Sequence, residues 1–449
     1  MVSITSALSS INSSPLSLFP GERVGQLSRE LGHAWRDSPL GPAETVAMFM
    51  RQVIAGNVSL AETCRLAGSQ VSPQAYCQAR RRLPTGVLHG LFGDLQDRLD
   101  PGTHAHAHLW HGHRVLLIDG SSFSTPDTPE LREHFGTASG QAPGCGFPVA
   151  HLLVLFCAST GLLLNVWASP RNTSDVGLTD EAHLLMETGD VLVGDDSFSG
   201  YPHIASLVAR GLHGVFPVHH LRKVDFRPGR AHCPGGKRAV AGRVKSKWVM
   251  SLGERDQIVR YFKPKQCPAR MSRERFEALP ESIRVREIRR RVRLPTGRRV
   301  TVTVVTTLLD AEKYPAEEIV ALRLRRWEVE TNLAHLKTTM KLDVLRSRSI
   351  EGVLKELTVI ALIYNLVRVV MLEAAKRQKV DVRRISFKDA YEWLRHARAG
   401  ETLPGLRVNP HRPERIEPRC RKRRPKQYDL MRKPRSELRT ALLKQSKTA

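Results

Sequence analysis

The spacing of apolar residues changes twice along the chain, which predicts a helical region, then a sheet-forming region, then more helices. Short continuous apolar runs are typical of strands buried on both faces. Such runs occur at 115–119, 151–157, 161–167, 190–195 and 214–220. A hairpin turn at Ser159-Thr160-Gly161 joins the second run to the third, and helical segments at 178–188 and 201–210 separate the later runs.

The resulting order is strand, strand, strand, helix, strand, helix, strand. It predicts an α/β fold of the ribonuclease-H-like class, a mixed sheet flanked by helices, because other α/β folds do not usually begin with three consecutive strands. Residues 221–310 break the rhythm with clustered basic residues and strand-like runs, and they predict a mostly β insertion. Eight arginines lie between 284 and 299, so one face of the insertion is expected to meet solvent or phosphate. A long helix is predicted next, from about Pro315 to Met340.

We therefore expect a catalytic core over 114–345 that contains this insertion, followed by C-terminal helices over 346–400. These helices are predicted at 353–376 and 386–399. The basic tail over 411–449 carries 14 Lys and Arg against 4 acids. Such a tail is typical of a disordered arm that binds DNA without sequence preference.

The first hundred residues predict a separate helical domain. Residues 1–40 are rich in Ser, Gly and Pro and are expected to be poorly ordered. Four short helices follow over 41–100, with a capping box of Ser59 and Glu62 at the second. The third helix ends in three arginines and follows a turn at Gly68. This pattern favours a DNA-binding helix-turn-helix and, equally, a plain helical subdomain with a solvated basic face.

Charge narrows the classes of partner. The 449 residues include 70 Lys and Arg against 44 Asp and Glu, a formal net charge of +26. An enzyme for small metabolites has little use for this excess, whereas a protein that neutralises phosphates needs it. The charge therefore predicts a nucleic-acid partner.

Several features predict a cytoplasmic protein with access to DNA and no membrane partner. The seven cysteines form no C-x-x-C pair, and their odd number suits a reducing compartment. No basic region followed by an apolar core marks a secretory signal in the first residues. The apolar stretch 353–372 is interrupted by Lys355, Glu356 and Arg368, which indicates a buried helix and not a membrane span.

Two buried strand runs each end in an aspartate, Asp119 after VLLI and Asp195 after DVLVG. An acid that closes a hydrophobic strand is costly unless solvent, a partner or a cation meets it. Phosphodiester cleavage with two metal ions needs carboxylates that converge from different elements. Mg²⁺ suits such a site because it takes few protein carboxylates and keeps positions for water and phosphate. Asp119 and Asp195 are therefore candidate metal ligands.

A third acid is predicted from helical geometry. At about 100° per residue, Glu330 shares one side of its predicted helix with four cations, Arg323, Arg326, Lys337 and Lys341. A separate apolar stripe runs along the adjacent edge. This arrangement is expected of a site that holds both metal and DNA phosphate, although ordinary charge pairing on a solvated helix face also explains it.

The histidine-rich run His104–His113 favours a solvated linker, since its alternating spacing does not fit a tetrahedral metal site well.

These residues together resemble a known family, the DDE transposases of bacterial insertion sequences in the IS-four group. The segment RLRRWEVETNLAHLK matches the family signature Y-x2-R-x3-E-x6-K, with Arg326, Glu330 and Lys337 at its R, E and K. IDGSSFSTPDTPE resembles the first-Asp motif and VLVGDDSFSGY the second. The resemblance extends from about residue 40 to residue 400.

The resemblance implies an enzyme that cleaves DNA at the ends of an insertion sequence and joins them to target DNA. It implies Asp119, Asp195 and Glu330 as ligands of two Mg²⁺ ions, with Mn²⁺ as a substitute. It also implies double-stranded DNA as partner, through terminal inverted repeats and target, and a homodimer in a synaptic complex at the bacterial nucleoid. Arg326 and Lys337 are expected to contact DNA near the reacting end.

Two positions depart from the family pattern. The signature tyrosine is Arg323 here, which keeps a phosphate-binding option but loses an aromatic hydroxyl. The second motif carries Asp196 where the family has arginine, so Asp196 rivals Asp195 as the metal ligand. A nuclease that cuts DNA without joining it and an inactive DNA-binding derivative are the alternative functions.

Overall fold

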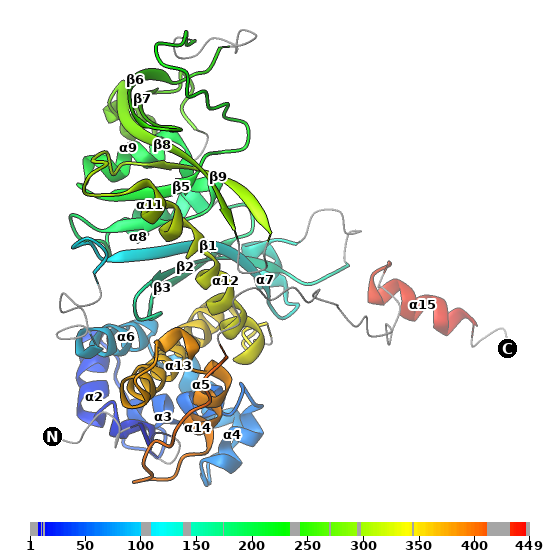
Figure 1. The fold of residues 1–449 in the computed structure, drawn as a ribbon. Helices are drawn as coiled ribbons and strands as arrows, with labels where there is room; N and C mark the ends of the chain where they lie inside the picture. Colours follow the sequence, from blue (N-terminus) through cyan, green and yellow to red (C-terminus); the bar gives the residue numbers. More distant parts are fainter. Residues whose placement is uncertain are drawn as a thin grey trace.

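A computed structural model describes residues 8, 9, 11, 14–99, 109–137, 145–173, 175–233, 243–268, 271–293, 298–343, 345–410 and 432–445. The His104–His108 part of the histidine-rich run, residues 294–297 of the predicted β insertion and the tail segment 411–431 lie outside these residues. The described chain consists of a sheet-containing part and a helical part, stacked one above the other in Figure 1.

The helical part begins earlier than the sequence predicts. Helix α2 (Gly21–Glu30) falls within the region expected to be poorly ordered. It buries Val24 and Leu27 and packs against α3 and α6. Arg23 on α2 also donates to Asp94 on α6 at 2.7 and 2.8 Å. These tertiary contacts order a segment whose composition alone favours a loop.

The four predicted short helices are present as α3 (Pro42–Ile54), α4 (Leu60–Leu66), α5 (Pro73–Arg82) and α6 (Thr85–Leu99). The Ser59 side chain accepts the Glu62 amide at the start of α4, and the Ser72 side chain accepts the Ala75 amide at the start of α5. Both capping signals in the sequence therefore mark true helix starts.

The described strands form one nine-stranded sheet in the order β3-β2-β1-β4-β5-β9-β8-β7-β6. Strand β1 pairs antiparallel with β2 and parallel with β4, and β4 pairs parallel with β5. The bounds of these strands are β1 (Val115–Ser124), β2 (Val149–Cys157), β3 (Leu163–Pro170), β4 (Val191–Val193) and β5 (His213–Pro217). Gly161, in the left-handed region at φ +70°, makes the predicted turn between β2 and β3.

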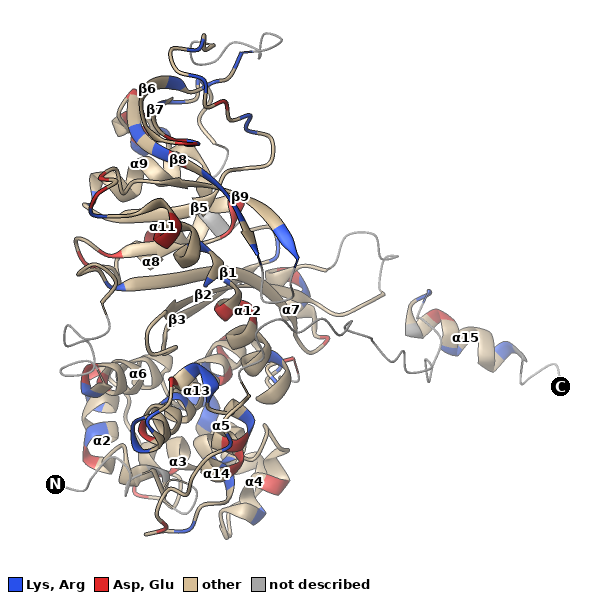
Figure 2. Cartoon of the chain, in the orientation of Figure 1, with Lys and Arg blue, Asp and Glu red and all other residues tan. Residues whose placement is uncertain are grey.

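The predicted β insertion continues this sheet. Its described strands are β6 (Lys247–Gly253), β7 (Asp256–Phe262), β8 (Ser282–Arg293) and β9 (Arg299–Thr306), and β9 pairs antiparallel with β5. Two arginines of the basic run on β8 share one face of the sheet but differ in exposure: Arg286 is buried against Asp256, whereas Arg290 reaches Glu317 at 2.8 Å. Figure 2 shows Lys and Arg along β8 and β9.

Helices cover both faces of the sheet. On one face, α8 (Thr179–His183), α9 (Tyr201–Ala209) and α10 (Arg273–Ala278) pack over a core that includes Leu116 and Ile118. On the other face, α11 (Ala316–Leu324) and α12 (Trp327–Ala334) share a core with Leu117 and Val193. That second core continues into the helical part.

Helix α13 (Ile350–Gln378) is the central helix of the helical part and packs on α3, α6, β3 and α14 (Phe387–His396). Its length and composition would suffice to cross a membrane, but 89% of its most apolar window is buried within the structure. Its Arg368 guanidinium donates to the Thr160 carbonyl in the β2–β3 turn, at 2.6 Å from Nη2. The polar residues in this apolar stretch therefore face protein partners.

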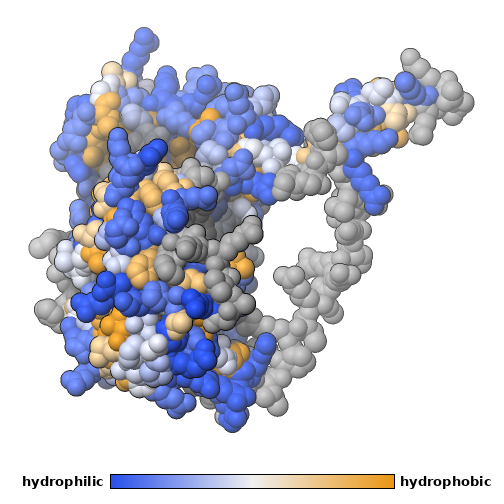
Figure 3. Space-filling view, turned by 90° about the horizontal axis from the view of Figure 1, so that it is seen from above, coloured by the Kyte–Doolittle hydropathy of each residue, from blue (hydrophilic) through white to orange (hydrophobic). Residues whose placement is uncertain are grey.

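Within the tail, α15 (Arg435–Gln445) projects away from the other described residues (Figures 1 and 3). Its Leu438, Leu442 and Leu443 are exposed. The remaining surface seen in Figure 3 is mostly hydrophilic, with scattered small apolar patches.

Candidate active site

Strand register places Asp119 beside Asp195. The parallel pairing of β1 with β4 ends with Leu117 opposite Val193. Two residues beyond this pair lie Asp119, which is still within β1, and Asp195, which follows the end of β4, so both acids lie at the same end of the paired strands. Strand β1 does not end at Asp119, as the sequence suggested, but continues to Ser124 because β2 pairs with its whole length. Asp119 therefore sits where the shorter neighbour β4 stops.

Gly194 lies between β4 and Asp195, at a position where neighbouring side chains leave no room for a Cβ atom. A Cβ atom there would lie 2.7 Å from the Phe198 ring and 3.0 Å from Ile118. Directly after it, Asp195 caps the short helix η4 (Asp196–Ser199) and accepts from the Ser197 amide at 2.9 Å and hydroxyl at 2.6 Å. Close packing at Gly194 and the hydrogen bonds from Ser197 thus fix the turn that carries Asp195.

The third predicted acid lies across from Asp119 on α12, which packs against β1. One guanidinium joins the two carboxylates: Arg326 Nη1 donates to Asp119 Oδ2 at 3.1 Å, and Nη2 donates to Glu330 Oε1 at 2.6 Å. The Asp119 side chain is 12% exposed, that of Arg326 15% and that of Glu330 41%. The three residues form a charged cluster that is open to solvent on the Glu330 side.

The long helix predicted from Pro315 to Met340 is wrong in one respect, because it is broken into segments. Helix α11 ends at Leu324, α12 begins at Trp327, and a π-helical turn follows over His335–Thr339. At the break, Arg325 donates to Glu328 at 2.9 Å and to the Ala158 carbonyl at 2.7 Å. The bond to Ala158 is a tertiary contact at the point where periodicity alone predicts a continuous helix. Turns of the π type are frequent at functional sites.

Arg323, on the last turn of α11, lies close to the acids. Burial lowers the pKa of its guanidinium, and the neighbouring Arg326 lowers it further. Attraction to Asp195, Asp196 and Glu330 acts in the opposite direction. Arg323 therefore interacts electrostatically with acids of both the η4 turn and α12.

Lys337 lies near the same strand. Its ammonium is 3.4 Å from the Ser121 hydroxyl on β1 and 4.0 Å from Asp343. Hydrogen bonds, strand pairing or charge interactions thus link five of the six predicted site residues to the end of the β1–β4 pair. The sixth, Lys337, lies further along β1, near Ser121.

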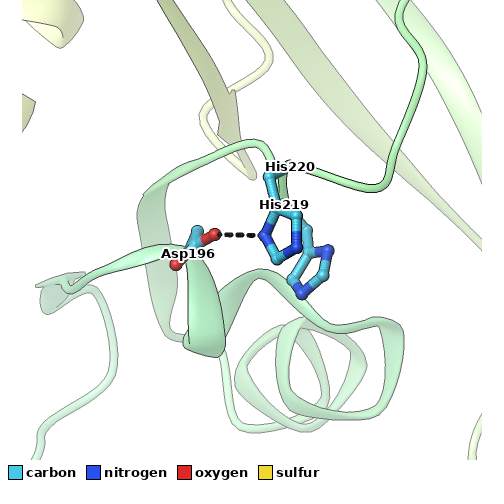
Figure 4. Close-up of side chains that lie close together, drawn as sticks. All are labelled: Asp196, His219 and His220. Atoms are coloured by element: carbon cyan, nitrogen blue, oxygen red, sulfur yellow. Dashed lines mark hydrogen bonds and ion pairs between the residues drawn. The ribbon is translucent and has the colours of Figure 1, made fainter.

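The carboxylate of Asp196, the rival of Asp195, faces His220 (Figure 4). Its Oδ2 is 3.2 Å from Nδ1 of His220, and the ring of His220 stacks on that of His219 with centroids 4.3 Å apart. Burial alone would raise the pKa of Asp196, but the hydrogen bond from His220 and the charge of His219 hold it below its usual range. The ligand atoms of Asp196, His219 and His220 all lie within 4.8 Å of one another.

The sequence did not single out these histidines, because the apolar run 214–220 reads as one strand. The structure ends β5 at Pro217, so His219 and His220 lie in the turn beyond it. Two consecutive histidines directly after a strand were the available signal. Among the described residues, Asp196, His219 and His220 are the group of His, Cys, Asp or Glu side chains whose possible ligand atoms all lie within 4.8 Å of one another. The carboxylates of Asp119, Asp195 and Glu330 do not form such a group in the described chain.

A basic cleft of about 1130 Å³ opens between α5 and the segment before α13. Its lining includes Arg81 and Arg82 from α5, and Arg346 and Arg348 from the segment. These four side chains belong to exposed residues. The segment also contacts the chain that follows β1, where the Thr128 hydroxyl donates to the Arg348 carbonyl at 3.2 Å. Figure 2 shows Lys and Arg gathered on α5 and beside α13.

Arg80, the first of the three arginines on α5, has a structural role. It is buried, donates to Gln52 at 2.9 Å and to Ser347 at 3.0 Å, and lies over the Phe49 ring at 3.8 Å. A side chain held in this way is not available to a DNA groove. The three arginines therefore do not act as one set, which corrects the simplest form of the helix-turn-helix interpretation.

The histidine-rich run contributes two described side chains with protein partners. His111 contacts Glu318 at 2.6 Å, and His113 contacts the Gly189 carbonyl at 2.6 Å and the Tyr314 hydroxyl at 2.7 Å.

Comparison with known proteins finds one family model and two transposases among the similar sequences. A family model described as "Transposase DDE domain" matches residues 110–366. Transposase InsG for insertion sequence element IS4, from Escherichia coli (strain K12), is 28% identical over 319 residues, which are 69% of this chain and 63% of that protein. The putative transposase InsZ of the same organism is 34% identical over 116 residues, 25% of this chain and 37% of that protein. The matches thus span less than two thirds of either relative.

Among solved structures, the chain is similar to one in the cryo-EM structure of the piggyBac transposase synaptic complex with hairpin DNA. The TM-score is 0.40 at 12% sequence identity, over 86% of this chain and 78% of that chain.

Proposed function

The chain belongs to the Transposase DDE domain family, whose model matches more than half of its residues, and from this we propose that it is a DNA transposase. It cleaves DNA at the ends of an insertion sequence and joins those ends to target DNA. The net charge of +26 supports a polyanionic substrate. Its place of action in this proposal is the bacterial nucleoid.

The proposed catalytic core is ribonuclease-H-like and is built on β3-β2-β1-β4-β5. Two features support this assignment. Strands β1, β2 and β3 are antiparallel neighbours in chain order, and β4 and β5 add to the other side of β1 in parallel. Helices α8 and α9 connect them in the predicted order. Strands β6–β9 then extend the sheet as the proposed insertion.

The proposed catalytic acids are Asp119, Asp195 and Glu330. One observation carries this proposal: the guanidinium of Arg326 donates hydrogen bonds to both Asp119 and Glu330. These bonds lie at the end of the β1–β4 pair that Asp195 also follows. These carboxylates come from three different elements and offer the oxygen ligands that Mg²⁺ prefers. When bound to them, two Mg²⁺ ions, or Mn²⁺, supply activation of the attacking oxygen and stabilisation of the leaving oxygen.

The cations around the acids have proposed roles of their own. Arg326 neutralises Asp119 and Glu330 together, and its Nε is buried without a hydrogen-bond partner among the residues that the structure describes. Arg323 also has a buried Nε without such a partner. A phosphate oxygen is an acceptor that suits a guanidinium with spare donors. Arg326, Arg323 and Lys337 are therefore proposed to hold the DNA backbone next to the acids.

The basic cleft extends this proposed DNA contact into the helical part. Arg81, Arg82, Arg346 and Arg348 line it from two elements, so a phosphate backbone that enters it is contacted from two sides. The contacts carry no obvious sequence information, because phosphate contacts position DNA and base contacts specify it. A homodimer that brings two ends together completes the proposal.

A strand-transfer assay tests the proposed function. The protein is incubated with Mg²⁺ and labelled DNA that carries the element's own ends, together with plasmid target. Joined product is the expected result. Nicked ends without joined product would support a nuclease, and binding without nicking would support an inactive DNA-binding derivative.

A further inference from the structure

The η4 turn carries two adjacent acids that face different partners. Asp195 Oδ1 accepts from Ser197, whereas Asp196 Oδ2 meets His220 at 3.2 Å. His219 and His220 come from the turn after β5 and stack on each other. Figure 4 shows both rings beside the Asp196 carboxylate, with one dashed contact joining Asp196 to His220. The acid and the two imidazoles belong to segments about twenty residues apart in the chain.

The ligand set determines which cation fits. Two imidazole nitrogens and one carboxylate oxygen suit Zn²⁺ and similar transition-metal ions, whereas Mg²⁺ prefers oxygen ligands alone. Ligand atoms around a tetrahedral Zn²⁺ lie about 3.3 Å apart, given bond lengths near 2.0–2.1 Å. The atoms of Asp196, His219 and His220 are already within 4.8 Å of one another. Small side-chain rotations therefore suffice to form the site.

We propose that Asp196, His219 and His220 bind one transition-metal ion of the Zn²⁺ class, at a site separate from the carboxylates of Asp119, Asp195 and Glu330. The ion takes the place of the hydrogen bond between Asp196 Oδ2 and His220 Nδ1, and a neutral His220 bound through Nδ1 carries its ring proton on Nε2. The Asp196 side chain is 40% exposed and that of His220 70%, so water completes the coordination. This inference does not depend on the proposed transposase activity.

The bound ion would cross-link two segments that already contact each other through Asp196 and His220. The η4 turn directly follows β4, and the His219–His220 turn directly follows β5. A cross-link between them restrains the turn that also presents Asp195. The ion therefore positions the turn that presents Asp195. Its presence is measured by metal binding and by the thermal stability of the chain.

The test is a Zn²⁺ titration of the full chain against a chromogenic chelator, with Co²⁺ absorption as a second readout of nitrogen ligation. The titration uses a background variant with His104→Ala, His106→Ala and His108→Ala, so that these histidines of the histidine-rich run cannot contribute to Zn²⁺ binding. This background is expected to bind one Zn²⁺ that excess Mg²⁺ does not displace. His220→Ala and Asp196→Asn should each weaken that binding by at least about tenfold.

Three control variants keep the outcome interpretable. His396→Ala removes an exposed histidine on α14 and should leave Zn²⁺ affinity unchanged. Asp119→Ala should also leave it unchanged, whether or not the chain cleaves DNA, so failure of the proposed function does not affect this test. Equal Zn²⁺ affinity in the background, His220→Ala and Asp196→Asn proteins overturns the proposal. Loss of Zn²⁺ binding in Asp195→Asn to the same degree as in Asp196→Asn would overturn the claim of a separate site.

Discussion

Two acid–arginine clusters in this molecule use the same chemistry in opposite ways. Glu356 on α13 has a side chain with 0% exposure. It accepts the Arg346 and Ser347 amides, each at 2.9 Å, and the Asn57 side chain, and Arg80 lies 3.9 Å away. At the proposed active site, the Glu330 side chain is 41% exposed, and among the described residues it pairs with the guanidinium of Arg326.

The difference separates a structural acid from one that can exchange partners. A buried carboxylate with several fixed donors from three segments is costly to disturb and holds those segments together. A half-open carboxylate whose partner is one flexible side chain loses little when a metal ion or phosphate replaces that partner. The closed cluster therefore joins the helical part to the segment that lines the basic cleft, and the open cluster is left for chemistry.

The largest expected effect is on the closed cluster. Glu356→Ala removes the buried acid and leaves two backbone amides and the Asn57 side chain without their acceptor, so the free energy of unfolding should fall by about 3–5 kcal/mol. Urea-induced unfolding measures it. The matched control is Glu373→Ala on the same helix, which breaks a surface pair with Arg377 and should cost less than about 1 kcal/mol. Equal losses in the two variants would remove the distinction between the clusters.

The next effect concerns Arg326 in the open cluster. Arg326→Ala should slow end cleavage by roughly 10²–10³-fold, the usual cost of removing one charged or hydrogen-bonding group from a reacting centre. Arg383→Ala, which breaks an exposed pair with Asp381, is the control and should cleave at the normal rate. The measurement is the single-turnover rate on labelled end DNA. A normal rate for Arg326→Ala would restrict this arginine to a structural role.

The smallest effect tests the arginines of α5 against each other. Arg81→Ala with Arg82→Ala should weaken binding to end DNA and scrambled DNA about equally. It should also flatten the slope of log affinity against log salt by about 1.8, since each phosphate contact contributes roughly 0.9. Arg80→Ala should instead lower stability and leave the slope nearly unchanged. A selective loss on end DNA in the double variant would show that α5 reads bases.

Much of the fold follows from the sequence because the strands are short, continuous apolar runs and the helices begin at clear capping residues. Three features do not follow. Helix α2 is ordered by contacts with α3 and α6 that its composition does not announce. The break between α11 and α12 depends on Arg325 reaching Ala158, a residue far away in the chain. The continuation of β1 past Asp119 depends on its partner β2.

The candidate site was accessible to sequence reasoning in part. Helical periodicity placed Glu330 and Arg326 on one side, and they do contact each other. Periodicity does not reveal that Arg326 also reaches Asp119, because that contact joins two elements far apart in the chain. The separate roles of Arg80 and Arg81 were hidden for the same reason, since burial of one arginine depends on Gln52 and Ser347.

The most direct test of the central claim compares two acids on one helix. Glu330 faces Arg326 and Asp119, whereas Glu328 pairs with Arg325 and Arg383. In single-turnover cleavage of labelled end DNA with Mg²⁺, Glu330→Gln should lose at least about a thousandfold in rate, equivalent to several kcal/mol of metal-dependent stabilisation. Its end binding should persist, and Glu328→Gln should cleave within a few fold of the unaltered chain. Cleavage by Glu330→Gln at the rate of Glu328→Gln would contradict the account.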